Sequence, residues 1–302
     1  MAGPGVTTSP WVAARRRAET LRDRHAFAAE VLSLYLALLD VWEESWADAR
    51  ADPPREPRAV AGWAAGRVLP RVVATTVRYG PEPLAKTLAD ADRAVTDAAG
   101  AELLTAWLTG VELAPLERYL ARAALRGPLE AVDAGAACAG DPAAGDPATR
   151  AGRRCPRCAG PPQLSFRTDA GDHLVSGRRQ LLCARCGHGW NFSGSTCAGC
   201  GETAGTKRTI YSERRAGPQV GRGEQRSGNG ADDRAADRDG VAVRFPHLRI
   251  EGCDSCARYL IDVDLGRDPR AVPEVDELAA LPLDLYAAER GISKIIPNLM
   301  GF

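Results

Sequence analysis

The sequence predicts an α+β protein: an N-terminal all-α helical bundle, then two tandem four-cysteine metal-binding units, then a C-terminal helix. Two observations support this fold class. The first half is rich in Ala, Leu, Glu and Arg, with apolar residues at helical spacing. The second half holds eight of the nine cysteines as Cys-x-x-Cys pairs, with segments between them that are typical of hairpins.

Changes in composition along the 302 residues predict the domain boundaries. A stretch rich in Ala, Gly, Pro and Asp separates the helical part from the cysteine units and is expected to be a linker. A second stretch has almost no apolar residue, so it cannot offset its own ordering entropy and is expected to be a disordered insertion. The expected segments are a helical domain at 1–134, a linker at 135–154, a first cysteine unit at 155–196, a second unit at 197–264 with the insertion at 216–240, and a C-terminal helix with an apolar tail at 265–302.

Several helices are expected in the first domain. One continuous helix is predicted over 15–50, because this segment contains no Pro or Gly and its apolar residues recur at helical spacing. An irregular or kinked helix is predicted over 57–77, where two glycines and a proline interrupt the pattern. Shorter helices should follow at 83–89, 91–107 and 115–134.

No group of residues in the bundle suggests catalysis. His25 has no second ligand four residues away, so a solvated or hydrogen-bonded side chain is expected. The run Arg15-Arg-Arg17 is followed by acids and is expected to be a solvated helix face. Four tryptophans at helical spacing are predicted to lie in the core: Trp42, Trp46, Trp63 and Trp107.

The cysteine pairs predict two metal sites. Two thiolates separated by two residues can face one ion, and a second such pair completes a tetrahedral four-sulfur site. The candidate ligands are Cys155, Cys158, Cys183, Cys186, Cys197, Cys200, Cys253 and Cys256. Zinc and iron are both compatible with four thiolates, and the ribbon-like spacing is typical of zinc ribbons.

The order of strands and cysteines favours sequential pairing, in which the first four cysteines form one site and the last four form the other. Each unit has a Cys-x-x-Cys turn, called a knuckle here, then a hairpin, then a second knuckle. The hairpins return through Leu181-Leu182 and through 208–211 with 248–250. A Gly or Ala follows the second cysteine of every knuckle, as a tight turn around a metal requires. An interleaved arrangement remains an alternative.

Disulfides and redox chemistry are weaker explanations of the same cysteines. The first ten residues lack the basic and apolar build of a signal peptide, so a cytoplasmic protein is expected. A thioredoxin-like site needs one pair opening a helix, whereas four pairs occur here on turns. Cys138 has no partner two residues away and is expected to be a bystander. His173, His188 and His247 are not expected to replace sulfur ligands, because every knuckle is complete.

The charge balance argues against nucleic-acid binding. Lys and Arg together number 39 and Asp and Glu together number 39, so no general attraction to phosphate exists. The longest apolar stretch, 31–39, is too short to cross a bilayer, and no membrane insertion is expected.

After the last knuckle, residues 258–264 alternate as a strand should. A helix is predicted over 273–290, with Leu278, Leu281 and Leu285 on one face and Gly291 at its end. The apolar tail at 292–302 is expected to pack on its own domain rather than to capture a partner.

The second half resembles the formate dehydrogenase accessory protein (FdhE) family over about 153–296, apart from the insertion. The segments that carry the resemblance are Cys155-Pro-Arg-Cys158, Cys183-Ala-Arg-Cys186-Gly-His-Gly-Trp190, Glu251-Gly-Cys-Asp-Ser-Cys256, and Asp276-Glu-Leu-Ala-Ala-Leu-Pro-Leu-Asp284. The helical half carries no comparable motif.

The resemblance implies a non-catalytic, cytoplasmic maturation factor that binds the catalytic subunit of a molybdenum- or tungsten-dependent formate dehydrogenase. It also implies rubredoxin-like surroundings for the eight knuckle cysteines, with two ions of iron or zinc used for structure or redox sensing. The insertion and the ending Asn298-Leu-Met-Gly-Phe302 depart from the family pattern, so assembly of a hydrogenase is a second hypothesis. A rubredoxin-like electron carrier and a zinc-ribbon nucleic-acid-binding protein are the remaining two hypotheses.

Overall fold

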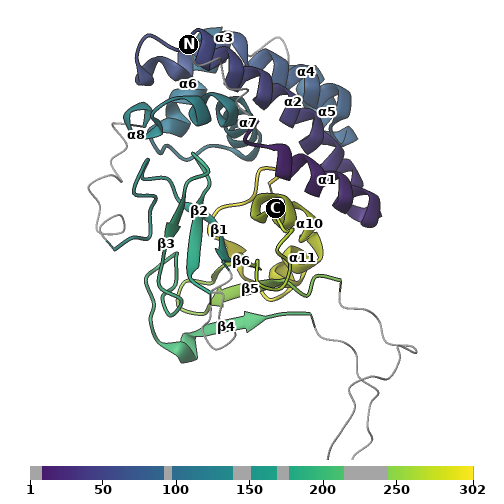
Figure 1. The fold of residues 1–302 in the computed structure, drawn as a ribbon, viewed down its shortest axis with the longest axis vertical. Helices are drawn as coiled ribbons and strands as arrows, with labels where there is room; N and C mark the ends of the chain where they lie inside the picture. Colours follow the sequence, from purple (N-terminus) through teal and green to yellow (C-terminus); the bar gives the residue numbers. More distant parts are fainter. Residues whose placement is uncertain (1–8, 92–96, 139–150, 169–176, 214–243, 302) are drawn as a thin grey trace, which may run out of the picture.

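The computed structural model describes residues 9–91, 97–138, 151–168, 177–213 and 244–301 (Figure 1). A layer of helices lies over a twisted sheet, and two short C-terminal helices pack beside the sheet beneath the first helix. This arrangement confirms the predicted α+β class, with a helical N-terminal region and a C-terminal helical segment. The expected insertion at 216–240 and most of the expected linker at 135–154 lie outside the described residues.

The first helix of the bundle is broken, so the continuous helix expected over 15–50 is wrong. Helix α1 spans Val12–Arg24, a 3-10 turn spans Ala26–Ala28, and α2 spans Ala29–Ala51. The chain reverses at His25, and α1 runs back along α2 with Trp11 against Trp42 at 6.2 Å between ring centroids. These contacts join residues about thirty positions apart, which helix propensity cannot register.

The other helices follow the expected order with shifted ends. The predicted irregularity over 57–77 takes the form of a 3-10 turn and two helices that meet at Val68. Trp42 and Trp107 are buried as predicted, whereas Trp46 and Trp63 are half-buried against the core. The bounds are Pro57–Ala59 (3-10), Val60–Arg67 (α3), Leu69–Tyr79 (α4), Glu82–Ala91 (α5), Asp97–Leu108 (α6), Pro115–Ala131 (α7) and Ala134–Ala137 (α8).

The described strands form one sheet of seven strands rather than two separate hairpin units. Its order is β3-β2-β1-β6-β5-β4, with β7 paired to β6. The two halves join where β1 and β6 run parallel, with Ser165 opposite Asp262. The strands are β1 Pro162–Arg167, β2 Arg179–Cys183, β3 Gly189–Asn191, β4 Arg208–Tyr211, β5 Leu248–Cys253, β6 Arg258–Asp264 and β7 Ser293–Lys294.

The C-terminal helix is also interrupted, which corrects the single helix expected over 273–290. Helix α10 spans Pro273–Ala279 and α11 spans Leu281–Glu289, with the break at Ala280. The expected shared face is lost across this break: Leu278 is buried, but Leu285 is 58% exposed. Gly291, with a φ of 72°, follows α11 in the left-handed conformation that favours glycine.

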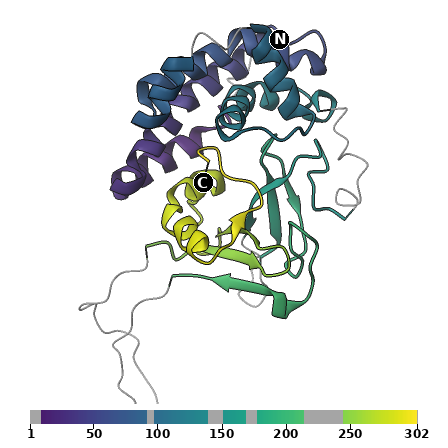
Figure 2. The ribbon, with the colours of Figure 1, turned by 180° about the vertical axis from the view of Figure 1, so that it is seen from behind.

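The apolar tail packs on the sheet of its own domain, as expected, and also on the helical bundle. Strand β7 pairs with β6, and the chain then runs toward the helices (Figure 2). Ile296 and Asn298 are buried there, and Arg122 of α7 donates a hydrogen bond to the carbonyl of Pro297 at 2.7 Å. The tail therefore contacts both the sheet and the bundle.

Helix α10 links the bundle to the sheet through a buried charged cluster. Arg17 of α1, expected on a solvated face, is only 5% exposed and donates from Nε to both carboxylate oxygens of Asp276, at 3.1 and 3.0 Å. The same guanidinium reaches Asp268 at 2.8 Å, and the Nε2 atom of His247 lies 2.7 Å from Asp276. Buried charges require such partners, so this cluster fixes α1 against α10.

His25 is buried rather than solvated. Its ring packs on Phe245, in the loop before β5, at 4.9 Å between centroids. Burial lowers the pKa of His25, with the neighbouring Arg24 acting in the same direction. The turn between α1 and α2 is thus packed on the chain that enters the sheet.

Arg17→Met should lower the free energy of unfolding by about 3–5 kcal/mol, because it leaves the buried carboxylate of Asp276 and the half-buried carboxylate of Asp268 without their shared cation. The measurement is denaturant unfolding of the metal-loaded protein. Arg16→Met at the exposed neighbouring position is the matched control and should change little. Equal stability of the two variants would show that the cluster does not hold the halves together.

Candidate metal centres

The first cluster consists of Cys155, Cys158, Cys183 and Cys186, which the turns before β1 and after β2 bring together. All four side chains are buried. The sulfur of Cys158 lies 3.4 Å from that of Cys183 and 3.3 Å from that of Cys186. The Cys155 and Cys186 sulfurs are 3.8 Å apart. A tetrahedron with metal–sulfur bonds of about 2.3 Å has edges of about 3.8 Å, so the set fits one ion.

The second cluster consists of Cys197, Cys200, Cys253 and Cys256. The sulfurs of Cys197 and Cys256 lie 3.9 Å apart, and those of Cys200 and Cys253 lie 3.7 Å apart. Cys200 is exposed and Cys256 is half-buried, unlike the first cluster. Within each cluster the sulfurs all lie within 4.8 Å of one another, so the cysteines group sequentially and not in an interleaved way.

The four knuckles share one backbone conformation. The residue after each second cysteine has a positive φ, between 51° and 86°: Ala159, Gly187, Gly201 and Ala257. In the first three knuckles the amide of this residue donates to the carbonyl of the first cysteine at 2.9–3.1 Å. Small residues are therefore required here, as the sequence indicated, because a left-handed turn wraps each pair of sulfurs.

Four thiolates without an open position suit zinc or iron, held for structure or for one-electron transfer. Burial raises the pKa of the Cys183 thiol, and a bound cation would offset this by favouring the thiolate. Neither described cluster includes a histidine. His188 contributes only its carbonyl, to the amide of Cys183, and His173 lies outside the described residues.

Cys138 lies closer to the site than its spacing suggested. It is buried at the end of α8, and its interaction with the Cys158 side chain, together with burial, raises the pKa of Cys138. It is not one of the four sulfurs of the cluster. No sequence signal could have shown this contact, since α8 and the first knuckle meet through tertiary packing.

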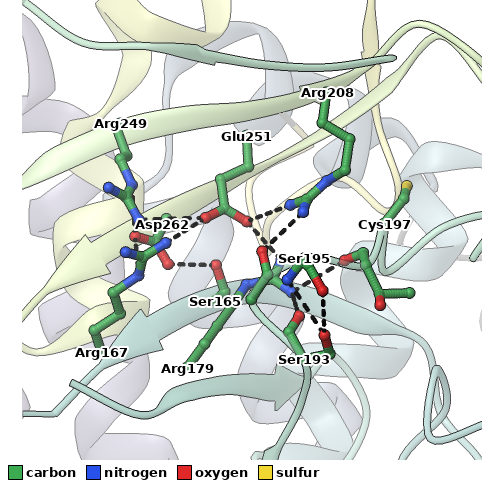
Figure 3. A network of polar contacts seen from close by, with 12 residues as sticks. Ser165, Arg167, Arg179, Ser193, Ser195, Cys197, Arg208, Arg249, Glu251 and Asp262 are labelled. Carbon is green, nitrogen blue, oxygen red and sulfur yellow. Dashed lines mark hydrogen bonds and ion pairs between the residues drawn. The ribbon is translucent and has the colours of Figure 1, made fainter. Parts of the chain in front are cut away.

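A buried ionic network connects strands of the two cysteine units (Figure 3). Glu251 of β5 accepts from Arg179 of β2 at 2.6 Å and from Arg167 of β1 at 2.8 Å. Asp262 of β6 pairs with Arg249 at 2.9 Å. Burial raises the pKa of Glu251, and the surrounding arginines oppose that shift.

The same network positions the chain that enters the second cluster. Arg179 also donates to the carbonyl oxygens of Ser193 and Thr196, at 2.9 and 3.3 Å. Arg208 donates to the carbonyl of Gly194 at 2.7 Å. The segment 193–196 leads directly into Cys197, so a strand of the first unit holds the first knuckle of the second. The sequence analysis missed this network because its members come from five different strands.

Fold and site together define a class of protein: a helical bundle joined to a single sheet that carries two closed four-cysteine clusters. A family model described as "FdhE, C-terminal domain" matches residues 227–300. A solved structure, the FdhE protein from Pseudomonas aeruginosa, has a TM-score of 0.59 and 21% identity, covering 97% of this chain and 96% of that one. This match shows the fold.

Two curated relatives extend the comparison. The "Protein FdhE homolog" of Aquifex aeolicus is 27% identical over 148 residues, which is 49% of this chain and 41% of that protein. Its counterpart from Pseudomonas aeruginosa is 29% identical over 146 residues, 48% of this chain and 38% of the relative. The matched part thus spans about two fifths of these relatives. The family model and the curated relatives show that the second half of the chain is similar to FdhE proteins, and the solved structure shows that the fold is shared.

Within the described residues, no helix has both the length and the apolar character needed to cross a membrane.

Gly160→Ala should weaken metal binding at the first cluster by about tenfold or more, because an added Cβ would lie 2.7 Å from the Cys183 sulfur and 3.2 Å from the Cys158 sulfur. Elemental analysis after dialysis should show metal content falling from two equivalents toward one. Gly194→Ala is the control, since no atom lies within 4 Å of its added Cβ. Full metal retention in Gly160→Ala would contradict the proposed ligand set.

A chelator should remove the metal of the second cluster before that of the first, because Cys200 is exposed while the first four sulfurs are buried. We expect two kinetic phases of about one equivalent each when release is followed with a coloured chelator. The double variant Cys197→Ser with Cys200→Ser should show only the slow phase. A fast phase in that variant would assign the labile metal to the first cluster.

Proposed function

We propose that the protein is a maturation factor for a molybdenum- or tungsten-dependent formate dehydrogenase and that it binds the catalytic subunit of that enzyme. The observation that carries this proposal is the pair of closed four-cysteine clusters on one sheet, combined with the likeness to FdhE proteins. The client and its subunit come from the family resemblance, and they are the part of the proposal that experiment must establish.

We infer that the eight knuckle cysteines hold two ions of iron or zinc and that the protein acts without catalysis of its own. A site with four protein sulfurs has no position left for water or substrate, so it stabilises a fold or carries one electron. The polar clusters described above support the same inference, because Arg17, Glu251 and Asp262 are engaged in ion pairs that hold elements together. A cytoplasmic site of action completes the proposal.

The metal sites would support client binding through the structure of the sheet. The first three knuckles are held by turn hydrogen bonds, and all four would be held by a metal bound to their sulfurs, so metal loss should loosen the ends of the strands. Metal-free protein should therefore bind the client poorly. A redox-sensing role is open to the second cluster in particular, since Cys200 and Cys256 are accessible.

Deletion of the gene should abolish formate dehydrogenase activity, and the purified protein should capture the catalytic subunit without oxidising formate. The measurement is affinity capture from native extract, followed by identification of the partners. The Cys155→Ser, Cys158→Ser variant tests the role of the first metal. It should lose one metal and capture much less of the catalytic subunit. Loss of hydrogenase activity alone would indicate that the client is a hydrogenase. Capture of nucleic acids alone would refute the proposal.

A further inference from the structure

An arginine just before the first knuckle contacts the third knuckle, which carries two ligands of the second cluster. Arg153 lies two residues before Cys155 and donates from Nη1 to the carbonyl of Gly199 at 2.6 Å. Its side chain also lies against Gly201, where an added Cβ would be 3.4 Å from Nε of Arg153. Gly199 and Gly201 stand on either side of Cys200, so Arg153 contacts both neighbours of an exposed ligand.

This contact restrains the backbone that presents Cys200. Because a peptide unit is planar, holding the carbonyl of Gly199 also holds the amide of Cys200. The amide of Gly201 donates to the carbonyl of Cys197 at 2.9 Å and closes the same knuckle from within. Hydrogen bonds from a charged donor are stronger than those between neutral groups. Arg153 therefore supports the third knuckle from outside, in addition to the hydrogen bond of the turn itself.

The place of Arg153 depends in turn on the first knuckle. Residues 151–154 belong to no helix or strand, so no ladder of backbone hydrogen bonds holds them. The carbonyl of Gly152 accepts from the indole of Trp190 at 2.8 Å. On the other side of Arg153 the chain enters the first knuckle, where the amide of Cys155 donates to the carbonyl of Gly160 at 2.9 Å. A metal bound to the sulfur of Cys155 would fix that end of the segment.

Arg153 differs from the other arginine that reaches the second unit. Arg179 starts from strand β2, inside the sheet, and ends on the carbonyl oxygens of Ser193 and Thr196, before the third knuckle begins. Arg153 starts beside a ligand of the first cluster and ends beside a ligand of the second. Its hydrogen bond therefore joins one metal site to the other directly.

We propose that Arg153 is a positioning residue of the second metal centre and that metal binding at the first cluster strengthens metal binding at the second through it. Filling the first site fixes the knuckle that follows Arg153, which keeps the guanidinium on Gly199 and steadies Cys200. Linkage requires the reverse effect too, so metal at the second cluster strengthens binding at the first by the same factor. This inference rests on the proposed metal occupancy of the eight cysteines, but not on the identity of the client.

The test measures the Zn²⁺ affinity of each cluster in the full-length protein by competition with a coloured chelator. The Cys197→Ser, Cys200→Ser variant lacks the second site and so identifies its dissociation constant. Arg153→Gln should weaken the second site by about tenfold, the effect of losing one hydrogen bond from a charged donor. The Cys155→Ser, Cys158→Ser variant should weaken it by a similar factor. Arg154→Gln removes a charge from the same segment but not the donor to Gly199, and as the control it should change nothing.

Combined variants separate coupling from a local loss of structure. In protein that already carries Cys155→Ser and Cys158→Ser, Arg153→Gln should weaken the second site little further, because both changes remove the same contact. Arg153→Lys should restore much of the affinity, since an ammonium group can also donate to the carbonyl of Gly199. A further tenfold loss in the combined variant would show that Arg153 acts without the first site, and it would overturn the coupling.

Failure of the coupling can be told apart from failure of the metal sites. Protein that binds Zn²⁺ at neither cluster would overturn this inference together with the proposed metal occupancy. Protein that binds Zn²⁺ at both clusters, with affinities unchanged by Arg153→Gln, would overturn this inference alone and leave the proposed function intact.

Discussion

The parallel pairing of β1 with β6 is the contact on which the rest of the structure depends. Each cysteine unit alone would be a small set of short strands, and isolated hairpins are at best marginally stable in water. The pairing merges them into one sheet, and a hydrogen bond of 2.6 Å from Ser165 to Asp262 lies across the junction. The arginines around Glu251 and Asp262 then hold strands of both units, so neither cluster can be displaced without disturbing the other.

A second buried polar chain explains why the bundle and the sheet behave as one body. It begins at Arg122 of α7 and passes through Gln163 of β1 to Glu277 of α10. Lys294 of β7 then bridges Glu277 and Asp284, at 2.9 and 3.1 Å. Loss of one member of this chain while the others stay buried would leave an uncompensated charge, which is costly. The seam is therefore a packed interface across the described residues.

Local chemistry decided what could be predicted from the sequence. Each knuckle depends on residues within five positions of one another, and so the candidate ligands and their small following residues could be found. Long-range contacts decided the rest. The reversal at His25 depends on Trp11 meeting Trp42, and the burial of Arg17 depends on an acid more than 250 residues away. Charge patterns along one helix cannot reveal such partners, and strand periodicity cannot reveal which strands pair in parallel.

The left-handed turns have a consequence for how the two clusters differ. An alanine in this conformation costs about 1–2 kcal/mol relative to glycine, which is roughly a tenfold change in an equilibrium constant. The first cluster has one such alanine, Ala159, and one glycine, Gly187; the second has Ala257 and Gly201. Each cluster therefore carries the same conformational penalty. Any difference in metal affinity between the two clusters must then come from their surroundings. Because the backbone contribution of the turns is equal, comparing the two affinities measures the effect of burial.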